Sequence, residues 1–257
     1  CAYGKHHHLT SEENYAAFKE KLPMVRYDEL HPWIERMKQG ERNVLCQGDL
    51  LAFEKSSGST AAAKWIPFNQ ALRDEFQEAI RAWMGDLHRR HPNLAGGRAY
   101  WVVSPLSHEE KTTQGGTPVG LANDNEYLGW WERTLSSWLR VANNPDLDMT
   151  ADELIRAKDL RLISVWNPSY LTLIWDKIIS HTDASITAAT LWKKLEIISA
   201  WADASAAADA EKIKQLFPHV TFQPKGLLAT EGVVTIPWGD DTLGAVPALN
   251  SHFLEFQ

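Results

Sequence analysis

Residues 160–180 read LRLISVWNPSYLTLIWDKIIS, and this stretch decides the fold. It opens with an apolar run over residues 160–166, which has the length of a buried strand. Apolar residues then recur at three- and four-residue spacing over 169–180, as they do on one face of a helix. A second apolar run follows at 195–201. Strands separated by helices predict an α/β fold, with helices packed on mixed, largely parallel sheets.

The same two patterns extend over the rest of the chain. The strongest helical pattern covers residues 69–90, with acidic residues early and Arg89–Arg90 at its end. Residues 104–125, rich in Gly, Thr, Pro and Asn, predict a long loop. Further helices are expected over residues 11–21, 27–39, 126–142, 151–158, 187–194 and 205–216. Further strands are expected over 49–54, 65–68, 100–103, 220–222, 226–229 and from 233 onward, ending in an alternating pattern over 253–256.

The composition excludes several classes of protein. The 257 residues contain 26 basic and 33 acidic side chains, a net charge of −7, without a Lys/Arg block, which argues against a nucleic-acid or membrane partner. No apolar run is long enough to cross a bilayer and no signal peptide is recognised. Two cysteines, Cys1 and Cys46, give no disulfide framework and favour a reducing, cytoplasmic location. The 12 tryptophans are an excess that favours large aromatic surfaces.

A loop of small and hydroxylated residues, KSSGSTAAAK over 55–64, lies between two expected strands. Small residues allow successive N–H groups to point inward around an anion, and Lys64 can add a charge. The loop therefore suits a polyphosphate, although it lacks the Gly-Lys-Ser/Thr of a P-loop. The alternative is a Ser/Ala-rich surface turn. The hydroxyl donors are Ser56, Ser57, Ser59 and Thr60.

A second candidate is the Thr230–Glu231 pair in the segment GLLATEG over residues 226–232. A hydroxyl and a carboxylate at the mouth of a strand can serve a Mg²⁺–phosphate group. The alternative is a solvated strand end without a ligand.

Together these motifs resemble those of the adenylate-forming enzymes, the firefly-luciferase-like superfamily. Within it, the chain is most similar to the bacterial branch of the GH3 family of acyl acid–amido synthetases, and the likeness runs over nearly its whole length. It is carried by YDELHPWIER at 27–36, GERNVL at 40–45, FPHV at 217–220, KGLLATEG at 225–232 and SHFLEF at 251–256.

The resemblance implies a two-step ligase that uses ATP and Mg²⁺. A carboxylic acid would first become an acyl-adenylate, and the amine of an amino acid would then form an amide. Glu231 would ligate Mg²⁺, and Lys64, Thr230 and Glu231 would be the catalytic residues. The ATP phosphates would be held by Ser56, Ser57, Gly58, Ser59, Thr60 and Lys64, and the nucleotide would also contact Ala229 and Thr230.

The resemblance also indicates an acyl pocket. Trp166, Pro168 and Trp238 are its expected residues, against the alternative that they are ordinary core packing. Leu227 stands where the plant members have a Tyr, so adenine would lie on an aliphatic surface.

The resemblance implies that residues 1–257 are a partial N-terminal domain, with the small C-terminal domain absent and little or no turnover by the chain alone. The expected partners are a small-molecule carboxylic acid and an amino acid. Two other functions stay open: a carboxylate–CoA ligase, and a non-catalytic small-molecule binding module that keeps the nucleotide pocket.

Overall fold

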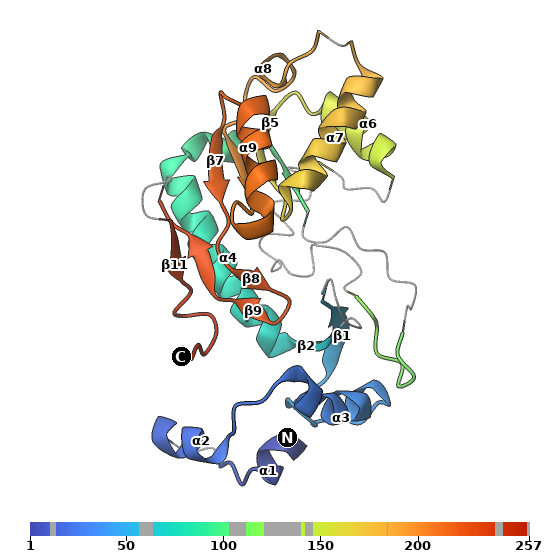
Figure 1. Ribbon diagram of the computed structural model, residues 1–257, viewed down its shortest axis with the longest axis vertical. Coiled ribbons are helices and arrows are strands. Elements are labelled where there is room, and N and C mark those ends of the chain that lie inside the picture. The colour runs from blue at the N-terminus through green and yellow to red at the C-terminus, as the bar shows by residue number, and fades with distance from the viewer. Residues whose placement is uncertain are drawn as a thin grey trace. The chain divides into compact units, whose positions relative to one another are not determined.

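The computed structural model describes residues 1–10, 14–56, 64–102, 112–120, 140–141, 146–183, 185–239 and 244–255 (Figure 1). The chain divides into two compact units. The first consists of Cys1–Asp74 and His108–Asn123, and the second consists of Glu75–Ser107 and Asp124–Gln257.

The first unit is built on an antiparallel hairpin and three helices. Its strands are β1 (Leu50–Lys55) and β2 (Trp65–Asn69), and its helices are α1 (Ala2–His6), α2 (Tyr15–Lys21) and α3 (Tyr27–Lys38). Ile34 and Met37 of α3 pack with Val44 and Phe53 in a small core. The expected helix over 27–39 and the two expected strands are confirmed.

The second unit is built on a five-stranded sheet of order β4-β3-β5-β6-β7. Every neighbouring pair in this sheet is parallel, and the three other sheets of the described chain are antiparallel pairs. The predicted α/β class with mixed, largely parallel sheets is therefore confirmed. The strands are β3 (Arg98–Trp101), β4 (Arg140–Val141), β5 (Leu160–Ser164), β6 (Ile197–Ala200) and β7 (Thr221–Pro224).

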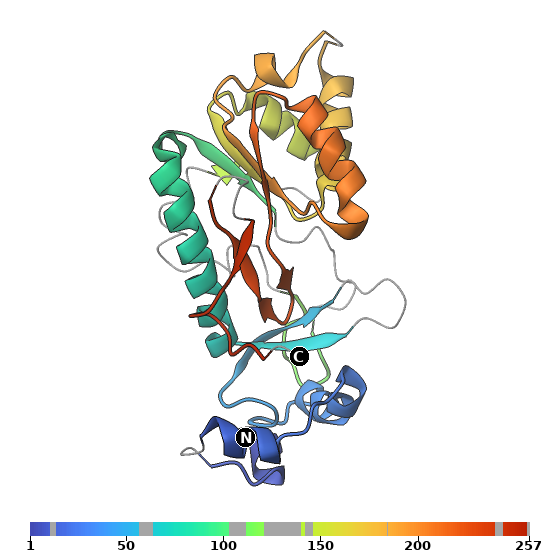
Figure 2. The ribbon, with the colours of Figure 1, turned by 60° about the vertical axis from the view of Figure 1, so that its left-hand side comes forward.

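Helices cover both faces of this sheet (Figure 2). One face packs on α6 (Leu147–Arg156), α7 (Pro168–His181) and α9 (Ala207–Leu216) through an extensive hydrophobic core of described residues. The other face packs on α4 (Gln70–Arg90), where Leu87 contacts Leu162 and Ile197. Two 3-10 turns, Pro92–Gly96 and Ala204–Ala206, and the short α8 (Ala188–Leu191) complete the connections. None of the described helices is both long and apolar enough to cross a membrane.

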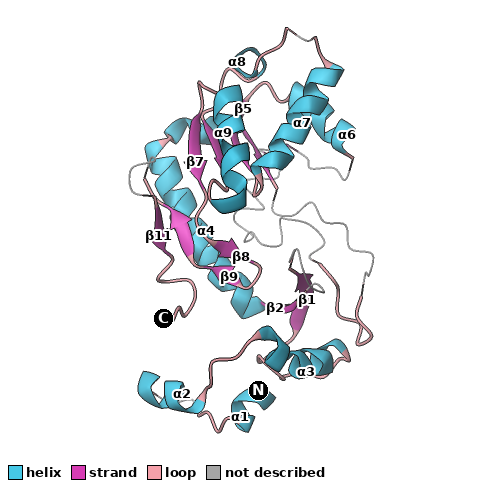
Figure 3. Ribbon diagram, viewed as in Figure 1, coloured by secondary structure: helices cyan, strands magenta, loops and turns pink. Residues whose placement is uncertain are grey.

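Two short antiparallel pairs follow the parallel sheet in the chain (Figure 3). In the first pair β8 (Leu228–Ala229) faces β9 (Gly232–Val233), and in the second β10 (Thr235–Pro237) faces β11 (Ala245–Pro247). The first pair carries the Thr230–Glu231 motif at its turn.

Three sequence-based expectations are wrong in part. The helix expected over 126–142 does not reach its predicted end, because Arg140 and Val141 pair with β3 as strand β4; residues 121–139 lie outside the described part. The strand expected at 253–256 is absent over 253–255, which pair with none of the described strands, and residue 256 lies outside the described part. The helix expected over 187–194 shrinks to α8, because Trp192 turns into the core and donates its Nε1–H to the Leu154 carbonyl.

A His–carboxylate cluster joins α6 to α7 and should make stability depend on pH. Nδ1 of His181 lies 2.9 Å from Asp152 and Nε2 lies 2.9 Å from Asp148, so both nitrogens can donate only in the imidazolium form. The hydrogen bonds with Asp152 and then Asp148 raise the pKa of His181 above its ordinary 6.5. The stabilisation is therefore complete below pH 6.5 and is lost as the pH rises through the folded pKa.

We expect His181→Ala to lower the melting temperature, relative to the wild type, by more at pH 6 than at pH 8. Thermal denaturation across that pH range measures the difference. Exposed His219 has no carboxylate partner among the described residues, so His219→Ala is the matched control and should show no such dependence. Equal losses at both pH values for His181→Ala would show that the cluster contributes nothing through its charge.

Candidate functional site

The β1–β2 hairpin holds the two ends of the predicted phosphate loop. The backbone N–H of Ser56 donates to the carbonyl of Lys64 at 2.9 Å, directly beyond the Lys55–Trp65 pair of the ladder. The hairpin is thus closed at the base of the loop. Four of the predicted phosphate-binding residues lie outside the described part of the chain: Ser57, Gly58, Ser59 and Thr60.

Lysines and aromatic rings gather at the open end of this hairpin. Lys64 is exposed, lies 5.6 Å from the Tyr27 ring and makes no ion pair with any described residue. The Tyr27 hydroxyl accepts the N–H of Trp65 at 2.7 Å, which fixes α3 beside β2. The ammonium groups of Lys38 and Lys55 lie 4.3 and 4.4 Å from the Trp65 ring. This positive charge suits an anion such as a phosphate.

A short loop, residues 112–120, pairs with the other edge of β1. The N–H of Phe53 donates to the Pro118 carbonyl, and the N–H of Gly120 donates to the Phe53 carbonyl, both at 2.8 Å. Gly115 packs so tightly on the end of α3 that an added Cβ would lie 2.3 Å from the Gly40 nitrogen. Strand β1 is therefore held on both edges, which makes the hairpin a firm base for the loop it carries.

The Thr230–Glu231 pair forms a two-residue turn between β8 and β9. Leu228 faces Val233 and Ala229 faces Gly232 across the hairpin. Ala229 and Thr230 are half-buried, whereas Glu231 is exposed and makes no hydrogen bond or ion pair with the described residues. The structure thus presents a carboxylate to solvent from a short, defined turn.

The base of this hairpin is fixed by a set of close backbone contacts. The N–H of Leu227 donates to Oγ1 of Thr235 at 2.7 Å, and the Leu227 carbonyl accepts the N–H groups of Val234 and Thr235 at 2.9 and 3.1 Å. Gly226 lies so close to Thr235 that an added Cβ would be 2.3 Å from the backbone carbonyl oxygen of Thr235. The Leu227 side chain is 62% exposed, so its aliphatic surface is available to a ligand.

Replacing Gly226 with Ala should lower the free energy of unfolding by about 1–3 kcal/mol, because the Thr235 backbone must move away. Urea denaturation measures this loss. Gly85 in α4 is the matched control, since an added Cβ there meets nothing within 4 Å. Gly85→Ala should stabilise by about 0.5–1 kcal/mol, the usual gain for a helix interior. A Gly226→Ala variant as stable as the wild type would contradict the tight packing at Thr235.

Glu231 fits the demands of a magnesium ion bound with a nucleotide. Mg²⁺ prefers oxygen ligands and usually takes one or two carboxylates together with substrate phosphates and water. No group of three His, Cys, Asp or Glu side chains able to hold a metal occurs in the described part of the chain. Phosphate and water would be the further ligands of a cation at Glu231, as is usual for Mg²⁺ bound with a nucleotide.

The predicted acyl-pocket residues lie next to different elements. Trp166 follows β5 and is half-buried, and its ring lies 5.4 Å from that of Trp201, which follows β6. Pro168 is buried in the first turn of α7. Trp238 is 37% exposed and lies beside α4, because the next residue, Gly239, donates its N–H to Asp86. Trp201 was not predicted as a pocket residue from the sequence. It lies with Trp166 at the carboxyl ends of β5 and β6, and open parallel sheets bind ligands at the carboxyl ends of their strands.

A buried lysine near the same edge was also missed. Lys225 follows β7 and is only 5% exposed, and its ammonium donates to Oγ of Ser164 at 2.8 Å. The ammonium lies 4.5 Å from the Trp83 ring and 5.4 Å from the Trp101 ring. Burial lowers the pKa of Lys225 to about 7. The available signal was a lysine between the predicted strands at 220–222 and 226–229, but such a lysine is usually solvated.

Comparison with known proteins identifies the family. The model of the GH3 family N-terminal domain matches residues 1–172. The chain belongs to the GH3 family. That match contains the β1–β2 hairpin together with Trp166 and Pro168, and it ends before the Thr230–Glu231 turn.

Among curated GH3 relatives, a jasmonoyl–L-amino acid synthetase of Nicotiana attenuata is 26% identical over 132 residues, which is 50% of this chain and 22% of that protein. An indole-3-acetic acid-amido synthetase of Arabidopsis thaliana is 32% identical over 104 residues, 40% of this chain and 17% of that protein. The aligned part is thus about a fifth of the length of these relatives.

A solved GH3 structure, an acyl acid amido synthetase in complex with 2,4-DB, superposes with a TM-score of 0.70 at 14% identity. It covers 87% of this chain and 49% of that one. The likeness confirms that the GH3 fold extends well beyond residue 172 of this chain.

Proposed function

We propose that the protein carrying this chain is an acyl acid–amido synthetase, which activates a carboxylic acid with ATP and transfers the acyl group to an amino acid. The observation that carries this proposal is Glu231, an exposed carboxylate without a partner among the described residues, held on a defined turn in a GH3 chain. The relatives that are named amido synthetases support the same class of reaction.

The first step joins a carboxylate to the α-phosphorus of ATP. One carboxylate oxygen forms the new O–P bond, the bond to the β-phosphate oxygen breaks, and pyrophosphate leaves. No side-chain nucleophile takes part, so catalysis depends on neutralising negative charge as the two anions approach.

Residues of this chain supply that neutralisation. Lys64 and the Ser56–Thr60 loop would hold the phosphates, because hydroxyl and ammonium donors at a closed hairpin bind anions well. Thr230 would donate its hydroxyl to the α-phosphate. Glu231 would hold Mg²⁺, which supplies positive charge to the triphosphate when it is bound.

The second step transfers the acyl group. The amine nitrogen attacks the acyl carbonyl carbon, AMP leaves with the C–O electron pair, and the nitrogen loses a proton. The Trp166–Trp201 pair would line the acyl side, since aromatic rings bury large apolar substrates effectively.

The test is ATP–pyrophosphate exchange by the intact protein, screened over a panel of aromatic and aliphatic carboxylic acids. Amide products with amino acids support the proposal, whereas thioesters with coenzyme A would make the protein a carboxylate–CoA ligase. ATP binding without exchange for any acid would leave a non-catalytic binding module and overturn the proposal.

Lys64→Ala should weaken ATP binding about ten- to a hundredfold, the usual cost of losing one hydrogen bond to a charged group. Isothermal titration calorimetry on the intact protein measures this change. Lys158 is an exposed lysine on the α6–β5 connection, so Lys158→Ala is the matched control and should bind ATP as the wild type does. Unchanged affinity in Lys64→Ala would remove Lys64 from the phosphate site.

A further inference from the structure

The turn at Ser251–His252 is fastened to α4 at two points. Oγ of Ser251 donates to the carbonyl of Glu75 at 2.6 Å, and Nδ1 of His252 lies 2.8 Å from the Glu75 carboxylate. The His252 ring also meets the Phe76 ring edge-on at 5.4 Å. These contacts fix the position and the plane of the imidazole.

The opposite edge of this imidazole lies against Gly232, the residue directly after Glu231. A Cβ added to Gly232 would be 3.1 Å from Cδ2 and Nε2 of His252 and 3.2 Å from Cε1. Gly232 is buried and the His252 side chain is only 9% exposed, so this contact is shielded from water. The ring therefore packs against the β8–β9 hairpin at the residue next to Glu231.

The hydrogen bonding of the ring assigns its orientation. A carboxylate only accepts, so Nδ1–H of His252 donates to Glu75, and Nε2 lies on the opposite edge of the ring, toward Gly232. Nε2 is buried and has no hydrogen-bond partner among the described residues. The carboxylate thus fixes the orientation of the imidazole, and residues that lie behind a metal ligand help to orient that ligand.

We propose that His252 is a positioning residue for Glu231: its ring, oriented by Glu75, supports the β8–β9 turn and sets where the Glu231 carboxylate stands. This inference rests on the proposed function, because it takes Glu231 as the residue that binds Mg²⁺. It adds two residues, His252 and Glu75, that would act through Gly232 and not as ligands of the nucleotide or the metal.

The test separates the two contacts of His252. His252→Asn keeps a donor for Glu75 but removes the ring, whereas His252→Phe keeps a ring against Gly232 but removes the donor. His252→Ala removes both contacts, and Glu75→Gln removes the charge that orients the ring. His88 is exposed on α4, and its hydrogen bond among the described residues is with the Met84 carbonyl of the same helix, so His88→Ala is the matched control.

Two readouts are measured on the intact protein. Calorimetry gives the ATP affinity with Mg²⁺ and with EDTA, and hydrogen exchange gives the protection of the amides at 230–232. We expect His252→Ala to reduce the Mg²⁺-dependent gain in ATP affinity about tenfold, the lower end of the range for residues that support a metal ligand. The affinity in EDTA should change less than twofold, and amide protection at 230–232 should fall.

The variants should rank in a defined order. His252→Phe and Glu75→Gln should lose part of the Mg²⁺-dependent gain, His252→Asn should lose more because the ring is gone, and His88→Ala should lose none. If His252→Ala does not fold, the inference is tested with His252→Phe, His252→Asn and Glu75→Gln. A wild-type gain in ATP affinity from Mg²⁺, or unchanged amide protection at 230–232, in His252→Asn would overturn the inference. If the wild-type protein bound ATP with the same affinity in Mg²⁺ and in EDTA, the proposed role of Glu231 would be overturned instead.

Discussion

Glu231→Gln should slow ATP–pyrophosphate exchange about a hundred- to a thousandfold, the range seen when one charge-stabilising group is lost. The amide keeps the shape and one oxygen of the side chain but removes the negative charge that attracts a hard cation. Because Glu231 makes no bond with the described residues, the substitution should leave the melting temperature unchanged. The measurement is exchange by the intact protein over a range of Mg²⁺ concentrations.

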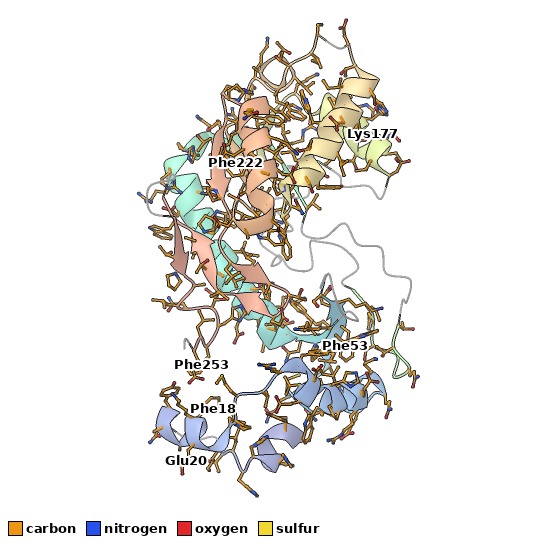
Figure 4. The ribbon with its side chains drawn as sticks, in the orientation of Figure 1. Phe18, Glu20, Phe53, Lys177, Phe222 and Phe253 are labelled. Carbon is orange, nitrogen blue, oxygen red and sulfur yellow. The ribbon has the colours of Figure 1, made fainter. Side chains whose placement is uncertain are left out.

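The matched control for this experiment is Glu20, another exposed glutamate, on α2 (labelled in Figure 4). Glu20→Gln makes the same chemical change at a position with no role in the proposed reaction, so its exchange rate should equal that of the wild type. An active Glu231→Gln with unaltered Mg²⁺ dependence would show that the metal is held elsewhere.

Lys225→Met should flatten the pH dependence of stability. With a folded pKa of about 7 and an unfolded pKa of 10.5, Lys225 is neutral in the native state and protonated in the unfolded state between these values. The unfolded state then binds more protons, so the wild-type free energy of unfolding should rise with pH by up to about 1.4 kcal/mol per unit in this window. Below pH 7 the lysine is charged in both states and its contribution is constant.

Urea denaturation from pH 6 to 10 measures this slope. Methionine has nearly the volume of the lysine stem and carries no charge, so Lys225→Met should be at least as stable as the wild type at pH 7. Lys158→Met, which changes an exposed lysine, should keep the wild-type slope. Parallel pH curves for Lys225→Met and the wild type would mean that Lys225 is not buried in the neutral form.

The parallel sheet could be predicted because its strands carry their own signal. The runs at 160–166 and 195–201 are apolar on both faces, as strands covered by helices on both sides must be. Arg140 and Val141 carry no such signal, since two residues become a strand only through pairing with Ala99 and Tyr100 of β3. The alternating residues near 253 illustrate the reverse, a strand pattern that pairs with none of the described strands.

The motifs of the candidate site could be predicted from the sequence, but the long-range contacts that hold these motifs in place could not. The loop at 55–64 and the Thr230–Glu231 pair are local in sequence, so composition and resemblance were enough to propose them. Their supports are contacts between distant residues: Trp83 reaches Gln223 and Lys225, and His252 reaches Glu75. Burial of Lys225 depends on the indole of a helix far away in the chain, which no local pattern contains.

The closed base of the β1–β2 hairpin bears on how the connection that it carries can change in length. The ladder from Lys55–Trp65 inward and the Ser56–Lys64 hydrogen bond fix the hairpin up to the base of the connection. Doubling the length of such a connection costs only about 0.6 kcal/mol in closure entropy. We therefore expect the hairpin to keep its register when residues are added to this connection.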